Sequence, residues 1–246
     1  GAITYTYITN SKPDGHVLGW NSTSVLTTTN LGNTTFDYDA MDHIGRVEYQ
    51  PQPFVVRADA KWNSFKEFVA ACKAAPGKLK VANSGTGSST HTAAIMLMNA
   101  AGCDVIHLPK GIKGRNKSVL NGESQAMISP LTGAVRLTKA KKLKILLMPT
   151  ANRSPLFPDV PTAKELGYDV ELDLFRGLSV SKGTPADVKM KLADAMTKAA
   201  KSDAFMALAK KKGFTVAPMG HKEFSALLAA EDAKVKKIFK SAGLYR

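Results

Sequence analysis

Residues 79–102 read LKVANSGTGSSTHTAAIMLMNAAG, and this stretch decides the expected fold. Residues 79–82 have the character of a short strand, and the loop at 84–90 carries two glycines that allow a sharp turn. An apolar helix follows and is predicted to end at Gly102, because glycine readily adopts the left-handed conformation that terminates many helices. A strand that leads through a glycine-rich loop into a helix is the repeating unit of α/β proteins.

The same alternation extends to both sides of this stretch. Upstream, Ser64 and Glu67 form an S-x-x-E capping box, which predicts a helix that Pro76-Gly77 ends. Downstream, helices alternate with three further predicted strands, at 105–108, 126–129 and 143–148. Thr184-Pro185 predicts another helix start. By contrast, residues 21–30 are crowded with Ser and Thr and are predicted to form a loop. Most of the chain is therefore predicted to be α/β.

Length and composition indicate a globular protein. The 246 residues suit two α/β lobes or one large domain, and the 44% hydrophobic and 22% charged residues are ordinary for such a fold. No apolar run approaches the roughly 20 residues that a membrane helix needs. No signal peptide stands at the start, which does not decide the compartment, because secreted proteins are often studied in their mature form.

The formal net charge of +14 requires a nucleic-acid partner to be considered. The basic residues are scattered, and the sequence contains no zinc-finger or RNA-binding signature. We therefore expect no nucleic-acid partner and assign most of the charge to solvated helix faces. The remaining charge could attract anionic ligands. A ligand-sensing or nucleic-acid-associated regulatory protein stays as the alternative function.

Two cysteines, Cys72 and Cys103, fall near the ends of consecutive predicted helices. Neither lies in a CxxC motif or in a metal-ligand spacing. They could form a disulfide in an oxidising compartment, or they could be two buried thiols. The sequence leaves both alternatives open.

The loop at 84–90 is the candidate ligand site. Backbone N–H groups at a helix N-terminus bind anions, and five hydroxyl side chains in the loop could add donors. These are Ser84, Thr86, Ser88, Ser89 and Thr90. The loop is thus a candidate cradle for a carboxylate or a phosphate. The alternative is a well-capped strand-to-helix turn, and the local sequence does not choose between them.

Enzyme motifs fail on spacing. Gly85-x-Gly87 lacks the third glycine of a dinucleotide fingerprint, and residues 111–118 resemble a P-loop but place Asn116 where its second glycine belongs. There is no GxSxG or HExxH motif. We therefore expect no catalytic residues, no metal and no cofactor. Arg176, next to a glycine, could bind a carboxylate or form a salt bridge with a neighbour such as Asp173.

Several segments together resemble one family. They include Pro13-Asp14-Gly15, Phe65-Lys-Glu-Phe, PGKLKVANSGTGSS at 76–89, HLPKG at 107–111, FPDVPT at 157–162, Phe175-Arg-Gly-Leu and SKGTPA at 181–186. In this order they are similar to the substrate-binding proteins of tripartite tricarboxylate transporters, the Bug proteins, over nearly the whole chain. Members of that family begin with a strand, a glycine-rich loop and a helix before the segment that matches Gly1. This unit is apparently absent from lobe one here: either the sequence is a fragment, or lobe one is completed in some other way.

The resemblance implies a two-lobed periplasmic-binding-protein fold of type II. Lobe one would comprise residues 1–56 and 147–246, lobe two would comprise 57–146, and hinge strands would lie near 54–57 and 146–150. It also implies a periplasmic receptor, monomeric and without enzymatic activity. The receptor would capture a small carboxylate (a di- or tricarboxylate, an acidic amino acid or an aromatic acid) for the membrane subunits of a transporter.

Binding residues can be carried over by position. From lobe one they are Asn21, Ser22, Thr23, Phe175 and Arg176. From lobe two they are Ser84, Gly85, Thr86, Gly87, Ser88, Ser89, Lys110, Gly111 and Ser129.

Overall fold

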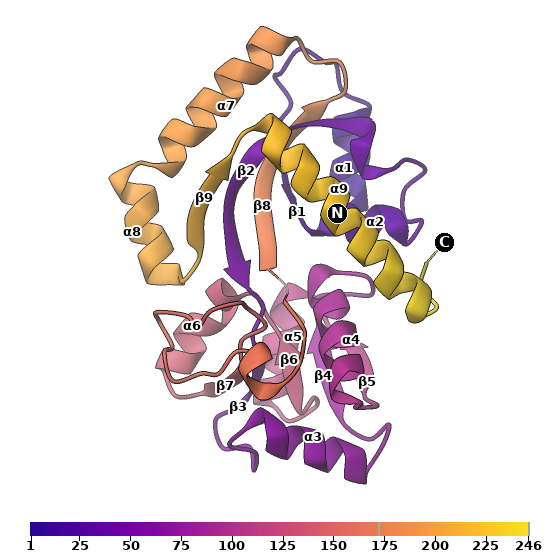
Figure 1. Ribbon diagram of the computed structural model, residues 1–246, viewed down its shortest axis with the longest axis vertical. Helices are drawn as coiled ribbons and strands as arrows, with labels where there is room; N and C mark the ends of the chain where they lie inside the picture. The colour runs from indigo at the N-terminus through magenta and orange to yellow at the C-terminus, as the bar shows by residue number, and fades with distance from the viewer. Residues whose placement is uncertain (172, 246) are drawn as a thin grey trace. The chain divides into compact units, whose positions relative to one another are not determined.

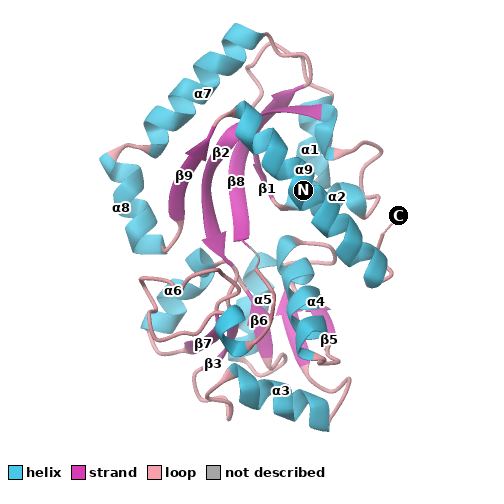
Figure 2. Ribbon diagram, viewed as in Figure 1, coloured by secondary structure: helices cyan, strands magenta, loops and turns pink. Residues whose placement is uncertain are grey.

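The computed structural model describes residues 1–171 and 173–245 and divides the chain into two compact units. Unit 1 comprises Gly1–Tyr49 and Phe175–Arg246, and unit 2 comprises Gln50–Leu174. Each unit contains one β-sheet with helices packed against it (Figures 1 and 2). The predicted α/β class is therefore confirmed.

Unit 1 contains a four-stranded sheet of order β1-β8-β2-β9. Its strands are β1 (Gly19–Ser22), β2 (Met41–Pro51), β8 (Asp173–Ser181) and β9 (Thr215–Met219). Its helices are α1 (Ala2–Thr9), α2 (Ser24–Asn30), the short 3₁₀ helix η1 (Tyr38–Ala40), α7 (Ala186–Ala200), α8 (Asp203–Lys212) and α9 (His221–Ser241). Both β1 with β8 and β2 with β9 pair in antiparallel fashion. The long helix α9 packs against α2, and α7 and α8 contact β9 (Figure 1).

Helix α2 corrects the predicted loop at 21–30. Val25 and Leu26 are fully buried and join the core that α9 contributes through Phe224 and Leu228. Burial of these two apolar side chains outweighs the weak helix propensity of the surrounding threonines. Tertiary packing, which the local sequence does not display, decides the conformation of this segment.

Unit 2 contains a five-stranded sheet of order β5-β4-β6-β3-β7. Its strands are β3 (Phe54–Arg57), β4 (Lys80–Asn83), β5 (Ile106–Pro109), β6 (Ala126–Ile128) and β7 (Leu143–Leu147). Its helices are α3 (Phe65–Ala74), α4 (Ser89–Ala101), α5 (Gly111–Leu120), α6 (Leu131–Lys139) and the 3₁₀ helix η2 (Lys164–Leu166). Strand β4 pairs in parallel with β5 and β6, whereas β3 is antiparallel to β6 and β7.

Helix α3 follows the sequence prediction. The Ser64 hydroxyl accepts a hydrogen bond from the Glu67 N–H at 3.2 Å, which confirms one half of the capping box. The Glu67 carboxylate in turn accepts from the Asn63 N–H at 2.8 Å. The apolar face of α3 then buries Phe65 and Phe68 against Phe54 of β3, with ring centroids 5.0 and 4.7 Å apart.

The boundaries of the two units differ from the boundaries expected for the two lobes. Residues 50–56 and 147–174 belong to unit 2, although the sequence assigned them to lobe one. Both expected hinge segments also lie within unit 2, since β3 pairs with β6 and β7 and the fully buried Val55 and Leu147 belong to its cores. The chain passes from one unit to the other within β2 and β8 instead.

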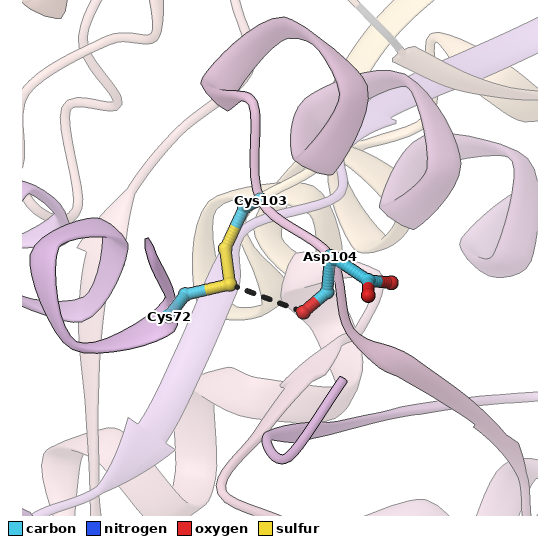
Figure 3. The surroundings of a disulfide bond; sticks show 3 residues. All are labelled: Cys72, Cys103 and Asp104. Carbon is cyan, nitrogen blue, oxygen red and sulfur yellow. Dashed lines mark hydrogen bonds between the residues drawn. A yellow bond between two sulfur atoms is a disulfide. The ribbon is translucent and has the colours of Figure 1, made fainter. Parts of the chain in front are cut away.

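A disulfide joins Cys72 of α3 to Cys103, which follows Gly102 at the end of α4 (Figure 3). The two Cα atoms are 5.8 Å apart. The Cys72 Sγ lies 3.3 Å from the carbonyl oxygen of Asp104. The disulfide decides between the two alternatives that the sequence left open.

Helix α4 is buried along most of its length, but its chemistry changes from one end to the other. Its first turn buries Ser89, Thr90, His91 and Thr92, and the later turns bury only apolar side chains. The left-handed Gly102, at φ +61°, ends it as predicted. In residues 1–171 and 173–245, no helix is long and apolar enough to cross a membrane.

Candidate ligand-binding site

Three helices begin at one edge of the unit 2 sheet. Strands β4, β5 and β6 run parallel, and each is followed directly by a helix: α4, α5 and α6 respectively. The carboxyl ends of parallel strands lie at the same edge of a sheet, so the N-termini of all three helices gather there. The first N–H groups of a helix lack intrahelical acceptors and carry partial positive charge. This edge therefore favours an anion.

The loop between β4 and α4 is held by its own hydrogen bonds. The N–H of Ser84 donates to Thr90 Oγ1 at 2.9 Å, and the N–H of Gly87 donates to His91 Nδ1 at 3.0 Å. Ser88 caps the helix, because its hydroxyl accepts from the His91 N–H at 3.2 Å. The loop is thus a well-capped turn, one of the two alternatives, and it also lies at the anion-favouring edge.

Glycine is needed at two positions of this loop. Gly85 and Gly87 have φ angles of +148° and +68°, which side chains other than hydrogen rarely allow. The Gly85 N–H donates to Asn83 Oδ1 at 2.9 Å. Thr86, between them, is exposed. The two glycines let the backbone turn sharply between the end of β4 and the start of α4.

His91 and His107 form an edge-to-face ring pair behind the loop, with centroids 5.0 Å apart. Burial, together with the neighbouring His107, lowers the pKa of His91 to about 4. Burial also lowers the pKa of His107. A neutral His91 leaves Nδ1 free to accept from the Gly87 N–H. The structure places His91 as a packed, hydrogen-bonded residue.

Acidification is expected to destabilise this loop. The folded-state pKa of His91 lies below the ordinary value of 6.5, so the unfolded chain binds more protons between pH 6.5 and about 4. Stability should therefore be full above pH 6.5 and fall as the pH approaches 4, with His91 contributing on the order of 2 kcal/mol. Thermal denaturation from pH 7 to 4.5 should show a smaller loss for His91→Gln than for the wild type. The exposed His16→Gln is the control, and an unchanged pH dependence in His91→Gln would contradict the prediction.

The other predicted binding residues of unit 2 are Gly111, Ser129 and Lys110, and they differ in what they offer a ligand. Gly111 begins α5 at φ +75°, with open space where a Cβ would lie, and the fully buried Ser129 follows β6 directly. Both lie at the sheet edge, with the 84–89 loop. The Lys110 N–H donates to the Asn83 carbonyl at 3.0 Å, but its ammonium forms an ion pair with Glu123. Lys110 thus contributes its backbone to this edge, while its charge is neutralised by Glu123.

Arg115 of α5 is a residue that the sequence analysis missed. Its side chain is 4% exposed, and its Nη1 donates to the Ser84 hydroxyl. Burial lowers its pKa to about 10, so the guanidinium stays charged at neutral pH. The i, i+4 spacing of Arg115 and the apolar Val119 was the available signal, because it places both side chains on the same face of the helix.

The predicted residues of unit 1 lie together at the junction of β1 and β8. Ser22 pairs in register with Arg176, and the Thr23 hydroxyl accepts from the Phe175 N–H at 3.2 Å. The Asn21 amide donates to the Ser179 hydroxyl, and Asn21 is fully buried. These bonds attach the end of β1 to β8.

Arg176 pairs with an acidic residue that differs from the expected neighbour. Its Nε lies 3.9 Å from a carboxylate oxygen of Glu48 on β2, and the Arg176 side chain is 32% exposed. The structural salt bridge that the sequence offered as one alternative is present, with Glu48 as its acidic partner. Within residues 1–171 and 173–245, no group of three or more His, Cys, Asp or Glu side chains could hold a metal ion.

Comparison with known proteins gives one consistent result. The model of the tripartite tricarboxylate transporter family receptor, TctC, matches residues 1–244. A UPF0065 protein encoded between tcbD and tcbE in Pseudomonas sp. strain P51 is 26% identical over 97% of this chain and 72% of its own length. A TctC solute-binding protein from Polaromonas, solved without ligand, is 30% identical, with a TM-score of 0.78 over 98% of this chain and 83% of its own.

Structures of proteins that are less similar in sequence share the fold. The protein MatC of Rhodopseudomonas palustris, solved with bound malate, is 21% identical, with a TM-score of 0.88 over 96% of this chain and 83% of its own. A second R. palustris protein, solved with adipate, is 20% identical, with a TM-score of 0.92 over 99% of this chain and 83% of its own. These matches confirm the predicted fold class, the two-lobed type of the periplasmic binding proteins.

Proposed function

Because the chain belongs to the tripartite tricarboxylate transporter family of receptors, we propose that it captures a small carboxylate and delivers it to the membrane subunits of such a transporter. The family is one of solute-binding receptors. The geometry of the site and the ligands of proteins with the same fold support a carboxylate as the solute. Membership of the family supports a transporter as the partner.

The observation that carries the proposal is the convergence of three helix N-termini at the carboxyl edge of β4, β5 and β6. Such an edge offers backbone N–H donors and partial positive charge to an anion. The two R. palustris structures contain malate and adipate, which are both dicarboxylates. Within unit 2, binding would use the 84–89 loop, Gly111 and Ser129. The end of β1, Phe175 and Arg176 stay the predicted binding residues of unit 1.

We also propose that the protein works in the periplasm. Disulfides form and persist in oxidising compartments, which include the bacterial periplasm, and are rare in the cytosol of mesophiles. The Cys72–Cys103 bond therefore supports this location.

Calorimetric titration tests the proposed ligand class. The panel should comprise malate, adipate, citrate, glutamate and benzoate, with the neutral diamide of adipate as the matched control. We expect saturable binding of at least one carboxylate, no binding of the diamide, and recovery of the bound acid unchanged. Absence of binding across the whole panel, or chemical conversion of the acid, would refute the proposal.

A further inference from the structure

Arg115 carries a buried positive charge that no acidic residue in the described part of the chain neutralises. None of its nitrogens lies within 4.0 Å of a carboxylate oxygen in residues 1–171 and 173–245, although several surface cations of the same unit form such pairs, for example Lys110 with Glu123. Charged side chains this deeply buried are almost always paired, because removing an ion from water is costly. An unpaired one points to a partner that is absent from the protein itself.

The guanidinium is only partly hydrogen-bonded. Its Nη1 donates to the Ser84 hydroxyl in the glycine-rich loop, while the buried Nε has no acceptor among the residues that the structure describes. A planar guanidinium binds oxyanions through two adjacent N–H groups, so the edge formed by Nε and Nη2 is the part left for an acceptor. The positive group is thus held by one contact and keeps donors for another.

The position of Nη2 places this edge at the start of α6. A Cβ built on Gly133, in the first turn of α6, would lie 3.2 Å from Arg115 Nη2 and 3.0 Å from Ser129 Oγ. The arginine therefore reaches from α5 across the ends of β4 and β6. It contacts Ser84 before α4 and lies beside the first turn of α6, where helix N–H groups also favour negative charge.

The two arginines that could bind a carboxylate differ in their surroundings. Arg176, which the family resemblance placed among the binding residues, is partly exposed and lies beside the carboxylate of Glu48. Arg115 is nearly inaccessible to bulk solvent, and no carboxylate of the described residues forms an ion pair with it. A ligand carboxylate near Arg176 would meet the negative charge of Glu48, whereas one at Arg115 would meet an uncompensated cation.

We propose that Arg115 is the cationic anchor of the ligand site, whose guanidinium pairs with an oxyanion group of the bound solute at the edge formed by Ser84, Ser129 and the first turn of α6. This inference rests on the proposed receptor function and extends it. A charged side chain, rather than backbone N–H groups alone, would then be the main determinant of anion selectivity. An acidic group is then required on the end of the solute that enters unit 2.

The first test compares Arg115→Gln with Lys117→Gln, which removes an exposed charge from the same helix. Titrations with malate and adipate should show roughly 10- to 100-fold weaker binding for Arg115→Gln, the range typical of losing a hydrogen bond to a charged group. Lys117→Gln should bind within about twofold of the wild type. Equal affinity of wild type and Arg115→Gln would overturn the anchor while leaving the receptor function intact.

A second variant separates binding from folding. Arg115→Met keeps much of the side-chain volume but removes the buried charge, so the ligand-free protein should melt at or above the wild-type temperature while binding is weakened. A purely structural arginine would give the opposite pattern, with a lower melting temperature and unchanged affinity. That pattern would refute the anchor.

Sulfate gives a test that does not depend on the carboxylate proposal. Sulfate stabilises proteins generally, so the measured quantity is the difference between variants. We expect the wild type and Lys117→Gln to gain more in melting temperature at millimolar sulfate than Arg115→Gln. Such a difference supports an oxyanion site at Arg115 even where no carboxylate binds, and equal gains in all three proteins contradict it.

Discussion

Phe224→Ala is expected to destabilise unit 1 by about 3–5 kcal/mol, the usual range for removing a large buried aromatic side chain. Phe224 is fully buried in α9, its ring lies edge-to-face against Phe175 at a centroid distance of 5.3 Å, and it also contacts the ring of His43 at 6.1 Å. The truncation would leave a cavity between α9 and the sheet, because β8 at Gly177 has no side chain that could fill it.

Urea unfolding monitored by circular dichroism measures this loss of stability. Phe224→Leu is the matched control, since it keeps most of the volume and should cost less than about 1.5 kcal/mol. A loss below about 1 kcal/mol for Phe224→Ala, or equal losses for both variants, would mean that the Phe224 ring does not support the sheet as described.

Replacing both Cys72 and Cys103 by alanine is expected to lower the free energy of unfolding by about 3–4 kcal/mol. The cross-link closes a loop of 31 residues, and the chain-entropy model gives a stabilisation of this size for such a loop. Alanine is preferred to serine because both positions are buried and a hydroxyl there would lack water.

Thermal denaturation with and without a reducing agent isolates the covalent bond. The reducing agent should lower the melting temperature of the wild type towards that of the double variant and leave the double variant unchanged. Indistinguishable melting temperatures for wild type and double variant in the absence of reductant would show that the bond adds no stability.

The sequence predicted best where local chemistry decides the structure. The Ser64–Glu67 box predicted the start of α3, and Gly102 predicted the end of α4. The two glycines of the 84–90 loop predicted the turn between β4 and α4. In each case the signal and its effect lie within a few residues of one another, so no knowledge of the tertiary fold is needed.

Predictions from the sequence failed where the packing or ion-pair partner of a residue lies in a distant segment of the chain. Nothing near residues 24–30 shows that Val25 and Leu26 meet α9, about two hundred residues later in the chain. The same limit applied to the arginines. Arg176 pairs with Glu48 of the distant strand β2, and Arg115 pairs with no acidic residue in the described part of the chain. Charge neutralisation is a property of the folded neighbourhood rather than of a motif.

The division of helix α4 into a polar first turn and an apolar remainder bears on how such receptors can diversify. Residues 88–92 are small hydroxyl residues and a histidine at the proposed ligand edge, whereas the later turns, which end beside the disulfide, carry the packing. Substitutions in the first turn can change hydrogen-bonding chemistry while the hydrophobic part of the helix keeps its volume. Under the proposed function, substitutions in the first turn would alter hydrogen bonding at the proposed site without disturbing the apolar residues that hold the domain, because the two sets occupy opposite ends of one helix.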